Sequence, residues 1–259
     1  MQNYPKLSNQ PLKLVLAEFR FSAVMGIEKY ISELQEILRP DYPTPASGKE
    51  QLVEVQPTGI NLSNVDNWSF ISMDKKSAIN INQHRLVYLT SDYPRFEGFS
   101  SKCEEALKTL QEVVKPGLIE RIGLRYSDLI LIDEGENIAD FVDSSLAPSG
   151  KLEVIGDLQQ QRNEYYILAD SGGLFIRTLY GKHNLSCLPD IHGLPIRIES
   201  EDEPSERMVL DFDHFWESKG ESIEFETQKI LDLLESLHKT SRDAFWNVTT
   251  DFARKEKWL

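Results

Sequence analysis

The chain has 259 residues, of which 40% are hydrophobic and 27% charged, and its formal net charge is -14 at pH 7. This composition is ordinary for a globular protein, and the length suffices for one large domain or two smaller ones. The negative charge argues against broad, non-specific nucleic-acid binding, because such a field repels phosphates, although it leaves room for a local basic patch. No apolar run reaches the roughly 20 residues that cross a bilayer, so we expect no membrane partner.

The N-terminus and the cysteines predict the compartment. Residues Met1 to Ser8 lack the charged and apolar regions of a signal peptide. Cys103 and Cys187 are the two cysteines, and neither lies in a CxxC spacing. We therefore expect a cytoplasmic protein whose thiols stay reduced.

The first half of the sequence predicts a strand, a helix, several antiparallel strands and a second helix. Alternating apolar residues indicate a strand from Leu12 to Ser22. Apolar residues at helical spacing predict helices over 26–38 and 95–114, each followed by proline. Short strands joined by turns are expected at 50–56, 67–73, 77–82 and 85–90.

The second half predicts a similar order of elements. A long strand is expected from Ile119 to Ile132, followed by a short helix over 137–145. A broad apolar stripe predicts the longest helix over 221–246. Further strands are expected at 151–158, 165–170, 174–180 and 208–212.

This recurrence predicts an α+β fold of two similar halves, 9–116 and 117–259, that form one compact body. Sequence identity between the halves is negligible, so the internal duplication is inferred from element order alone. The second half contains a long insertion at about 181–206. Long irregular loops within compact domains tend to be functional or mobile.

The common catalytic motifs are missing from the sequence. It contains no GxxxxGK(S/T) loop for nucleotide phosphates, no HExxH, no GxSxG and no paired CxxC. We therefore expect no catalytic residues and no cofactor, and the sequence favours a role other than catalysis.

Charged residues on the two long predicted strands are candidates for a binding site. Glu18 and Arg20 share one face of the first strand, and Arg121 and Arg125 share one face of the second. In one interpretation these residues form ion pairs that hold the two strands in register. In the other, Arg20, Arg121 and Arg125 form a shelf that binds an anion or ligand. We favour the ion pairs, which would join the halves at their seam.

A late strand contains a metal-like pair of carboxylates. At strand spacing Asp211 and Asp213 share a face, and two carboxylates can hold Mg²⁺ with water completing the shell. The alternative is a strand end whose polar side chains face solvent or cap the next turn.

Acidic and aromatic residues of the second half are candidates for contact with a protein partner. The acidic run that includes Glu201, Asp202 and Glu203 is either a solvated loop or a docking site for a basic partner. Aromatic residues such as Trp216 favour a core plus a protein contact surface. Trp258, near the C-terminus, docks either onto this chain or onto a partner.

Several motifs occur as separate segments: PLxxVxxExRF at 11–21, YPRFEGF at 93–99, IGLRY at 122–126 and LDFD at 210–213. In combination they resemble a sporadically distributed, largely uncharacterised prokaryotic protein family of similar length. Where that family often has an asparagine after the third motif, this chain has Ser127 and Asp128. The resemblance implies a two-half α+β protein without an established reaction, cofactor or catalytic residue. Its patchy distribution suggests a role in defence or toxin neutralisation.

These observations predict a non-catalytic interaction or regulatory protein, an accessory subunit of a prokaryotic defence or toxin-neutralising system. Its partner would be another protein or a second copy of the chain. The alternative is a small-ligand or anion-binding protein, or an enzyme, that uses an arginine and carboxylate pocket. Convergence of the candidate side chains on a concave pocket would favour the alternative, whereas burial in ion pairs would favour the interaction protein.

Overall fold

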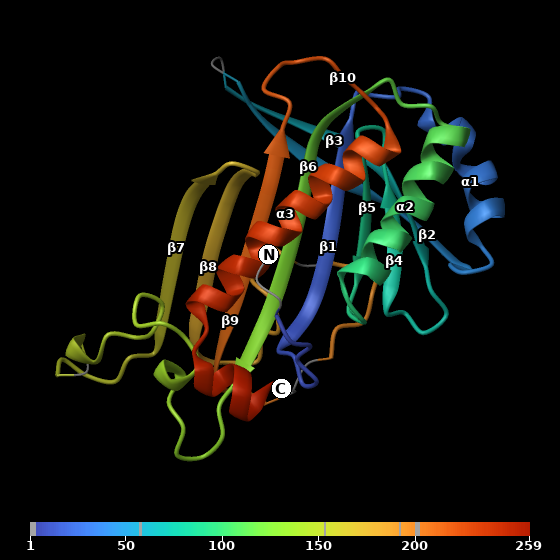
Figure 1. Ribbon diagram of the computed structural model, residues 1–259. Helices are drawn as coiled ribbons and strands as arrows, with labels where there is room; N and C mark the ends of the chain where they lie inside the picture. Colours follow the sequence, from blue (N-terminus) through green and yellow to red (C-terminus); the bar gives the residue numbers. More distant parts are fainter. Residues whose placement is uncertain (1–3, 57–58, 153, 192, 200–202) are drawn as a thin grey trace.

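The computed structural model describes residues 4–56, 59–152, 154–191, 193–199 and 203–259. Helices and one large antiparallel sheet make up the fold, which confirms the α+β class (Figure 1). The helices are α1 (Ile31–Leu38), α2 (Phe96–Val113) and α3 (Thr227–Val248). The strands are β1 (Leu12–Phe21), β2 (Thr44–Gln56), β3 (Gly59–Ile71), β4 (Ser77–Ile81), β5 (Arg85–Thr90), β6 (Leu118–Leu131), β7 (Gln160–Ala169), β8 (Gly172–His183), β9 (Ser205–Glu217) and β10 (Ile223–Glu224).

The sheet runs without a break through both halves of the chain, in the order β2-β3-β4-β5-β1-β6-β9-β8-β7, and β10 pairs with β6. The first strands of the two halves, β1 and β6, are antiparallel neighbours at its centre. Their register sets Glu18 opposite Gly123 and Leu16 opposite Arg125. The two predicted halves are therefore joined by backbone hydrogen bonds along their first strands.

Helices α2 and α3 cover one face of the sheet (Figure 1). The apolar stripe of α2 buries Phe99, Cys103 and Leu107 against it, as the helical spacing predicts. On α3, Ile230 and Leu234 are buried in the same core. Burying one large apolar side chain contributes about 1.5–3 kcal/mol, so this face supplies much of the fold's stability.

The predicted insertion covers part of the opposite face. The connection between β8 and β9 spans residues 184–204. Its Cys187 and Ile196 pack with Leu14, Ala78 and Leu89 in a second apolar cluster. The loop therefore gives this face a core of its own.

Two predicted elements of the second half differ in the structure. The expected helix over 137–145 is only a 3-10 turn, Ile138–Asp140. The strand expected over 151–158 is wrong: a 3-10 turn, Gly150–Leu152, begins there, and none of the described residues of that stretch is in a strand. Val154 and Ile155 are exposed, so their apolar pattern has no partner to pair with. In the described part of the second half, no α-helix thus corresponds to α1, and the internal duplication stays a prediction.

None of the helices in the described ranges combines the length and the apolarity needed to cross a membrane.

The turn between β7 and β8 requires glycine. Gly172 has φ +138°, and a Cβ there would lie 2.0 Å from the carbonyl oxygen of Phe215 on β9. We expect Gly172→Ala to lower the free energy of unfolding by about 2–4 kcal/mol, because backbone must shift to admit the methyl group. Gly48→Ala is the matched control, since a Cβ at Gly48 meets nothing within 4 Å. Urea unfolding of both variants tests this, and equal midpoints would contradict it.

Candidate functional site

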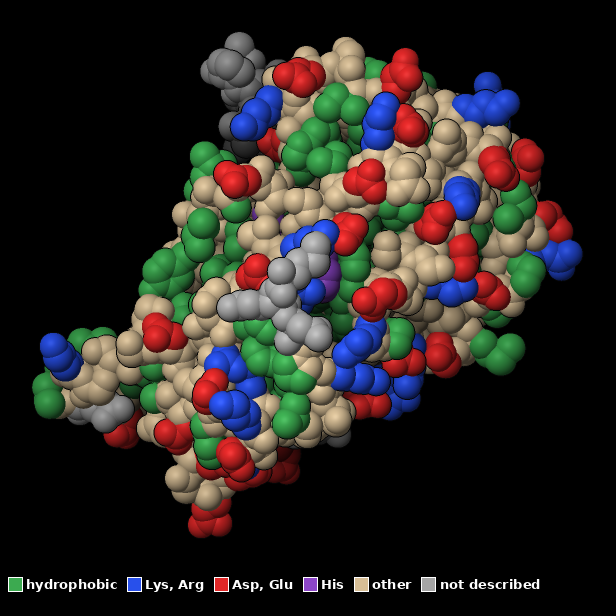
Figure 2. All heavy atoms as spheres, in the orientation of Figure 1, with side chains coloured by type: hydrophobic (Ala, Val, Ile, Leu, Met, Phe, Trp, Pro, Cys, Tyr) green, Lys and Arg blue, Asp and Glu red, His purple; other side chains and the backbone are tan. Residues whose placement is uncertain are grey.

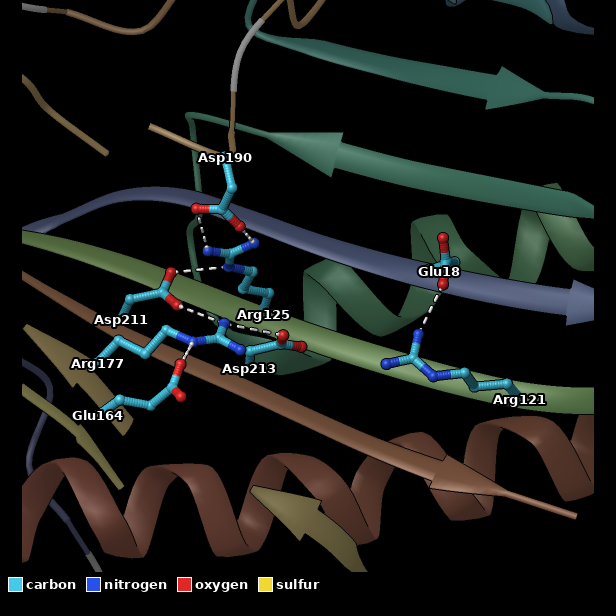
Figure 3. Close-up of polar contacts among 8 residues, drawn as sticks. All are labelled: Glu18, Arg121, Arg125, Glu164, Arg177, Asp190, Asp211 and Asp213. Atoms are coloured by element: carbon cyan, nitrogen blue, oxygen red, sulfur yellow. Dashed lines mark hydrogen bonds and ion pairs between the residues drawn. The ribbon is translucent and has the colours of Figure 1, made fainter. Parts of the chain in front are cut away.

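The sheet face opposite α2 and α3 gathers most of the charged residues selected from the sequence (Figure 3). Antiparallel register places them in two groups along the central strands. The Glu18 cluster comprises Glu18, Arg20, Arg85 and Arg121. The Asp211 cluster comprises Arg125, Glu164, Arg177, Asp190, Asp211 and Asp213.

In the Glu18 cluster, one carboxylate contacts three guanidinium groups. Glu18 Oε1 lies 2.7 Å from Arg20 Nε and 2.7 Å from Arg121 Nη1. Its Oε2 lies 2.9 Å from Nη1 of Arg85. Glu18 is 8% exposed. Its burial would raise the pKa, but Arg20, Arg85 and Arg121 together hold the pKa of this carboxyl below its usual value.

Arg125 contacts different carboxylates. Its Nε donates to Asp211 Oδ1 at 2.8 Å, and its Nη1 and Nη2 donate to the two oxygens of Asp190 at 2.7 and 3.1 Å. The ion pair expected between the two long strands therefore forms at Arg121 but not at Arg125. The reason is register, because Arg125 lies opposite Leu16 on β1 and Asp213 on β9.

Asp211 and Asp213 share a face, as the strand spacing predicts, and Arg177 contacts both. Arg177 Nη1 lies 3.1 Å from Asp213 Oδ2 and 3.7 Å from Asp211 Oδ2 (Figure 3). Burial raises the pKa of Asp211 to about 6, against the opposing effect of Arg125. Two guanidinium groups beside these carboxylates oppose a bound cation. Within the described ranges, no group of three or more His, Cys, Asp or Glu is placed to hold a metal ion.

Aromatic rings extend the charged face toward the edge of the sheet. The guanidinium carbon of Arg121 lies 4.6 Å from the centre of the Phe215 ring, and that of Arg177 lies 4.5 Å from the Phe175 ring. Tyr166 on β7 continues the row, 4.7 Å from Phe175 between ring centres. Arg121 and Arg125 are thus engaged by carboxylates and rings of this chain, which supports ion pairing over an anion-binding shelf. Arg20, whose side chain is 49% exposed, is the most accessible of the three predicted anion-binding arginines.

The residues predicted to contact a partner are scattered. Glu201 and Asp202 lie outside the described residues. Glu203 is exposed just before β9, and Trp216 is half-buried against the main core. Trp258 is buried, with its ring next to Phe141 and Phe245, so it docks onto this chain.

An exposed apolar run on β7 was not selected from the sequence as a site. Tyr165, Tyr166, Ile167 and Leu168 are consecutive and all exposed, and Leu168 is 74% exposed. β7 ends the sheet, and among the described strands it pairs only with β8. Four adjacent apolar residues in an otherwise polar strand are the sequence signal for this feature.

The sequence also missed four members of the clusters: Arg85, Glu164, Arg177 and Asp190. Glu164 and Arg177 are directly opposed in the β7–β8 register, so pairing the two predicted strands could have found them. Asp190 comes from the long loop, and nothing in its sequence context indicates a partner.

In comparisons with protein-family models, curated proteins and solved structures, none matched this chain. Membership of the prokaryotic family that the motifs resemble therefore stays a prediction.

Proposed function

We propose that this protein is a non-catalytic interaction protein that assembles through the outer edge of β7. The apolar run from Tyr165 to Leu168 on that edge carries the proposal. An edge strand presents unpaired backbone N–H and C=O groups, and natural proteins usually blunt such edges with charge or proline. Addition of a further strand would satisfy these groups and cover the apolar side chains.

The partner we propose is a second copy of the chain, paired antiparallel through β7. Pairing centred on Tyr166 places this residue opposite its own copy and Tyr165 opposite Ile167. The same register sets Arg162 of each copy opposite Asp170 of the other, so the two-fold symmetry of the dimer gives two such pairs. Both residues are exposed in the structure. These two ion pairs offset some of the repulsion between chains that each carry a charge of -14.

The oligomeric state in solution tests this assembly. We expect a dimer by light scattering at concentrations up to about 100 µM, and a monomer for Tyr166→Lys, since the proposed register places the two lysines directly opposite one another. Met73→Lys is the matched control, because Met73 is 85% exposed in the turn between β3 and β4. A wild-type monomer throughout, or equal effects of both variants, would exclude the proposal.

A charge swap tests the register itself. Arg162→Asp and Asp170→Arg should each weaken the dimer, because each places like charges opposite one another. The double variant should restore dimerisation, since the two ion pairs form again with reversed polarity. If the double variant stays as weak as the single ones, β7 does not pair in this register.

The ion-paired state of Arg121 and Arg125 supports this interaction role over an enzyme that uses an arginine and carboxylate pocket. That the protein is an accessory subunit of a defence or toxin-neutralising system rests on the family resemblance, and it stays a prediction.

A further inference from the structure

A pocket of about 270 Å³ lies on the helix-bearing face, on the other side of the sheet from both charged clusters. Five segments line it: residues 4–12, the segment 93–97 at the start of α2, part of β6, Phe212 of β9 and the C-terminal half of α3. Figure 2 views this face, where Lys and Arg side chains gather among hydrophobic ones in the lower central part. The volume is near the lower end of the ~300–1,000 Å³ typical of ligand sites, which suits a small ligand.

Asp128 of β6 is the buried carboxyl group of this pocket. It is 4% exposed, it lines the pocket, and its side chain makes no hydrogen bond or ion pair with any described residue. Burial raises its pKa to about 8, and the charge of Asp211 adds to the effect. A buried carboxyl group without a hydrogen-bond partner costs stability. Its presence in a pocket therefore points to a ligand whose N–H groups donate hydrogen bonds to it.

Three cations line the pocket: Lys6, Arg95 and Arg242. Lys6 and Arg95 are exposed, and neither forms an ion pair within the described part of the chain. The Nε of Arg242 is buried without a hydrogen-bond partner. Arg242 Nη2 also lies 3.7 Å from Asp243 Oδ1, so its charge is partly balanced. In a protein of net charge -14, the three cations still outnumber the acidic residues that line the pocket, Glu97 and the largely protonated Asp128, which makes the site locally positive. Such a site attracts an anionic group.

The walls between these polar groups are aromatic. Phe96 stacks on His238 with ring centres 3.9 Å apart. The hydroxyl group of Tyr126 forms a hydrogen bond of 2.8 Å with Nδ1 of His238. Trp246 stacks on Tyr4 at 4.6 Å. Burial, with Arg242 and Lys239 nearby, lowers the pKa of His238 to about 3, so the ring stays neutral. Neutral aromatic walls suit a flat ring.

We propose that this pocket binds a mononucleotide. Its base would lie among the aromatic side chains and donate ring or amino N–H groups to Asp128. Its phosphate would lie at the cationic residues Lys6, Arg95 and Arg242. This differs from a P-loop site, because side chains supply the phosphate contacts here, and it is independent of assembly through β7.

Calorimetric titration of the full chain with GMP, AMP, CMP and UMP tests the proposal. We expect at least one nucleotide to bind. Its nucleoside should bind at least about tenfold more weakly, because the charge-assisted contacts to the phosphate are lost. Inorganic phosphate alone and tryptophan are the comparison probes. No binding by any nucleotide at about 1 mM, or binding by tryptophan alone, would overturn the proposal.

Variants assign the two ends of the ligand. Asp128→Asn should weaken nucleotide binding at least about tenfold, because ligand N–H donors favour the ionised carboxylate, whose two oxygens both accept, whereas the amide presents one acceptor and an N–H donor. It should not unfold the chain. The pKa of Asp128 is raised to about 8 in the folded state, so this carboxyl group costs stability as the pH rises from its usual pKa to about 8, and the amide removes that cost. Lys6→Gln with Arg95→Gln should abolish the preference for nucleotide over nucleoside.

The matched control removes two exposed cations elsewhere, Lys29→Gln with Arg39→Gln at α1, and should leave binding unchanged. If that control weakens binding as much as the pocket variants do, the nucleotide is held by general charge attraction and the site is wrong. Unchanged binding in Asp128→Asn would equally overturn the assigned orientation.

Discussion

Replacing Glu18 by glutamine is expected to lower the free energy of unfolding by about 3–5 kcal/mol at pH 7. The amide keeps the shape of the side chain but leaves Arg20, Arg85 and Arg121 facing one another without the carboxylate that all three contact. Removing one partner of a buried ion pair leaves the remaining charge buried without compensation, which accounts for this magnitude. Urea unfolding measures it.

Arg20→Met is the control for Glu18→Gln. The Arg20 side chain is 49% exposed, so its loss should cost no more than about 1 kcal/mol. Because the folded-state pKa of Glu18 is lowered, its stabilising effect is present above the usual carboxyl pKa and is lost as the pH falls through the lowered value. The difference between wild type and Glu18→Gln should therefore shrink on acidification. A difference below about 1 kcal/mol at pH 7 would contradict the central role of Glu18.

Replacing Arg125 by methionine is expected to cost about 3–5 kcal/mol at pH 8. The substitution leaves the fully buried Asp211 without its closest cation. The pKa of Asp211 is raised to about 6 even with Arg125 present, so stability is lost as the pH rises from the usual carboxyl pKa to about 6, and the full cost of the buried charge is present above that pH. The loss should therefore be smaller at pH 5, where Asp211 is largely protonated. Urea unfolding at both pH values measures this.

A double variant separates the ion pair from other effects of the Arg125 side chain. Arg125→Met with Asp211→Asn removes both charges, so it should recover at least about half of the loss caused by Arg125→Met alone. Strictly additive effects of the two substitutions would show that Arg125 and Asp211 are not energetically coupled.

The sequence pattern predicted the secondary structure correctly where one face of a helix or strand is buried. The helix α2 and the long strand β6 occur within one residue of their predicted bounds, whereas α3 begins at Thr227, six residues after its predicted start, because β10 occupies Ile223–Glu224. Prediction failed over 151–158, where Val154 and Ile155 are apolar but exposed. An apolar pattern indicates a strand only if a partner strand covers it, and the sequence does not show the partner.

The candidate sites followed from sequence only in part. Glu18 and Arg121 could be paired in advance, because each lies on the first long strand of its half. Asp190 could not, since it reaches Arg125 from a long loop. The pocket around Asp128 was also missed, although an acidic residue in an apolar strand was a signal.

By itself, the sequence determined the α+β class, the position of the main helices and the alternation that puts charges on one face of β1 and β6. These depend on side-chain periodicity, which is local. Only the tertiary structure decided which charges meet, that both halves share one sheet, and that β7 forms its edge. It also decided that segments from opposite ends of the chain enclose one pocket. Register and strand order are contacts between residues distant in the sequence, so periodicity carries no information about them.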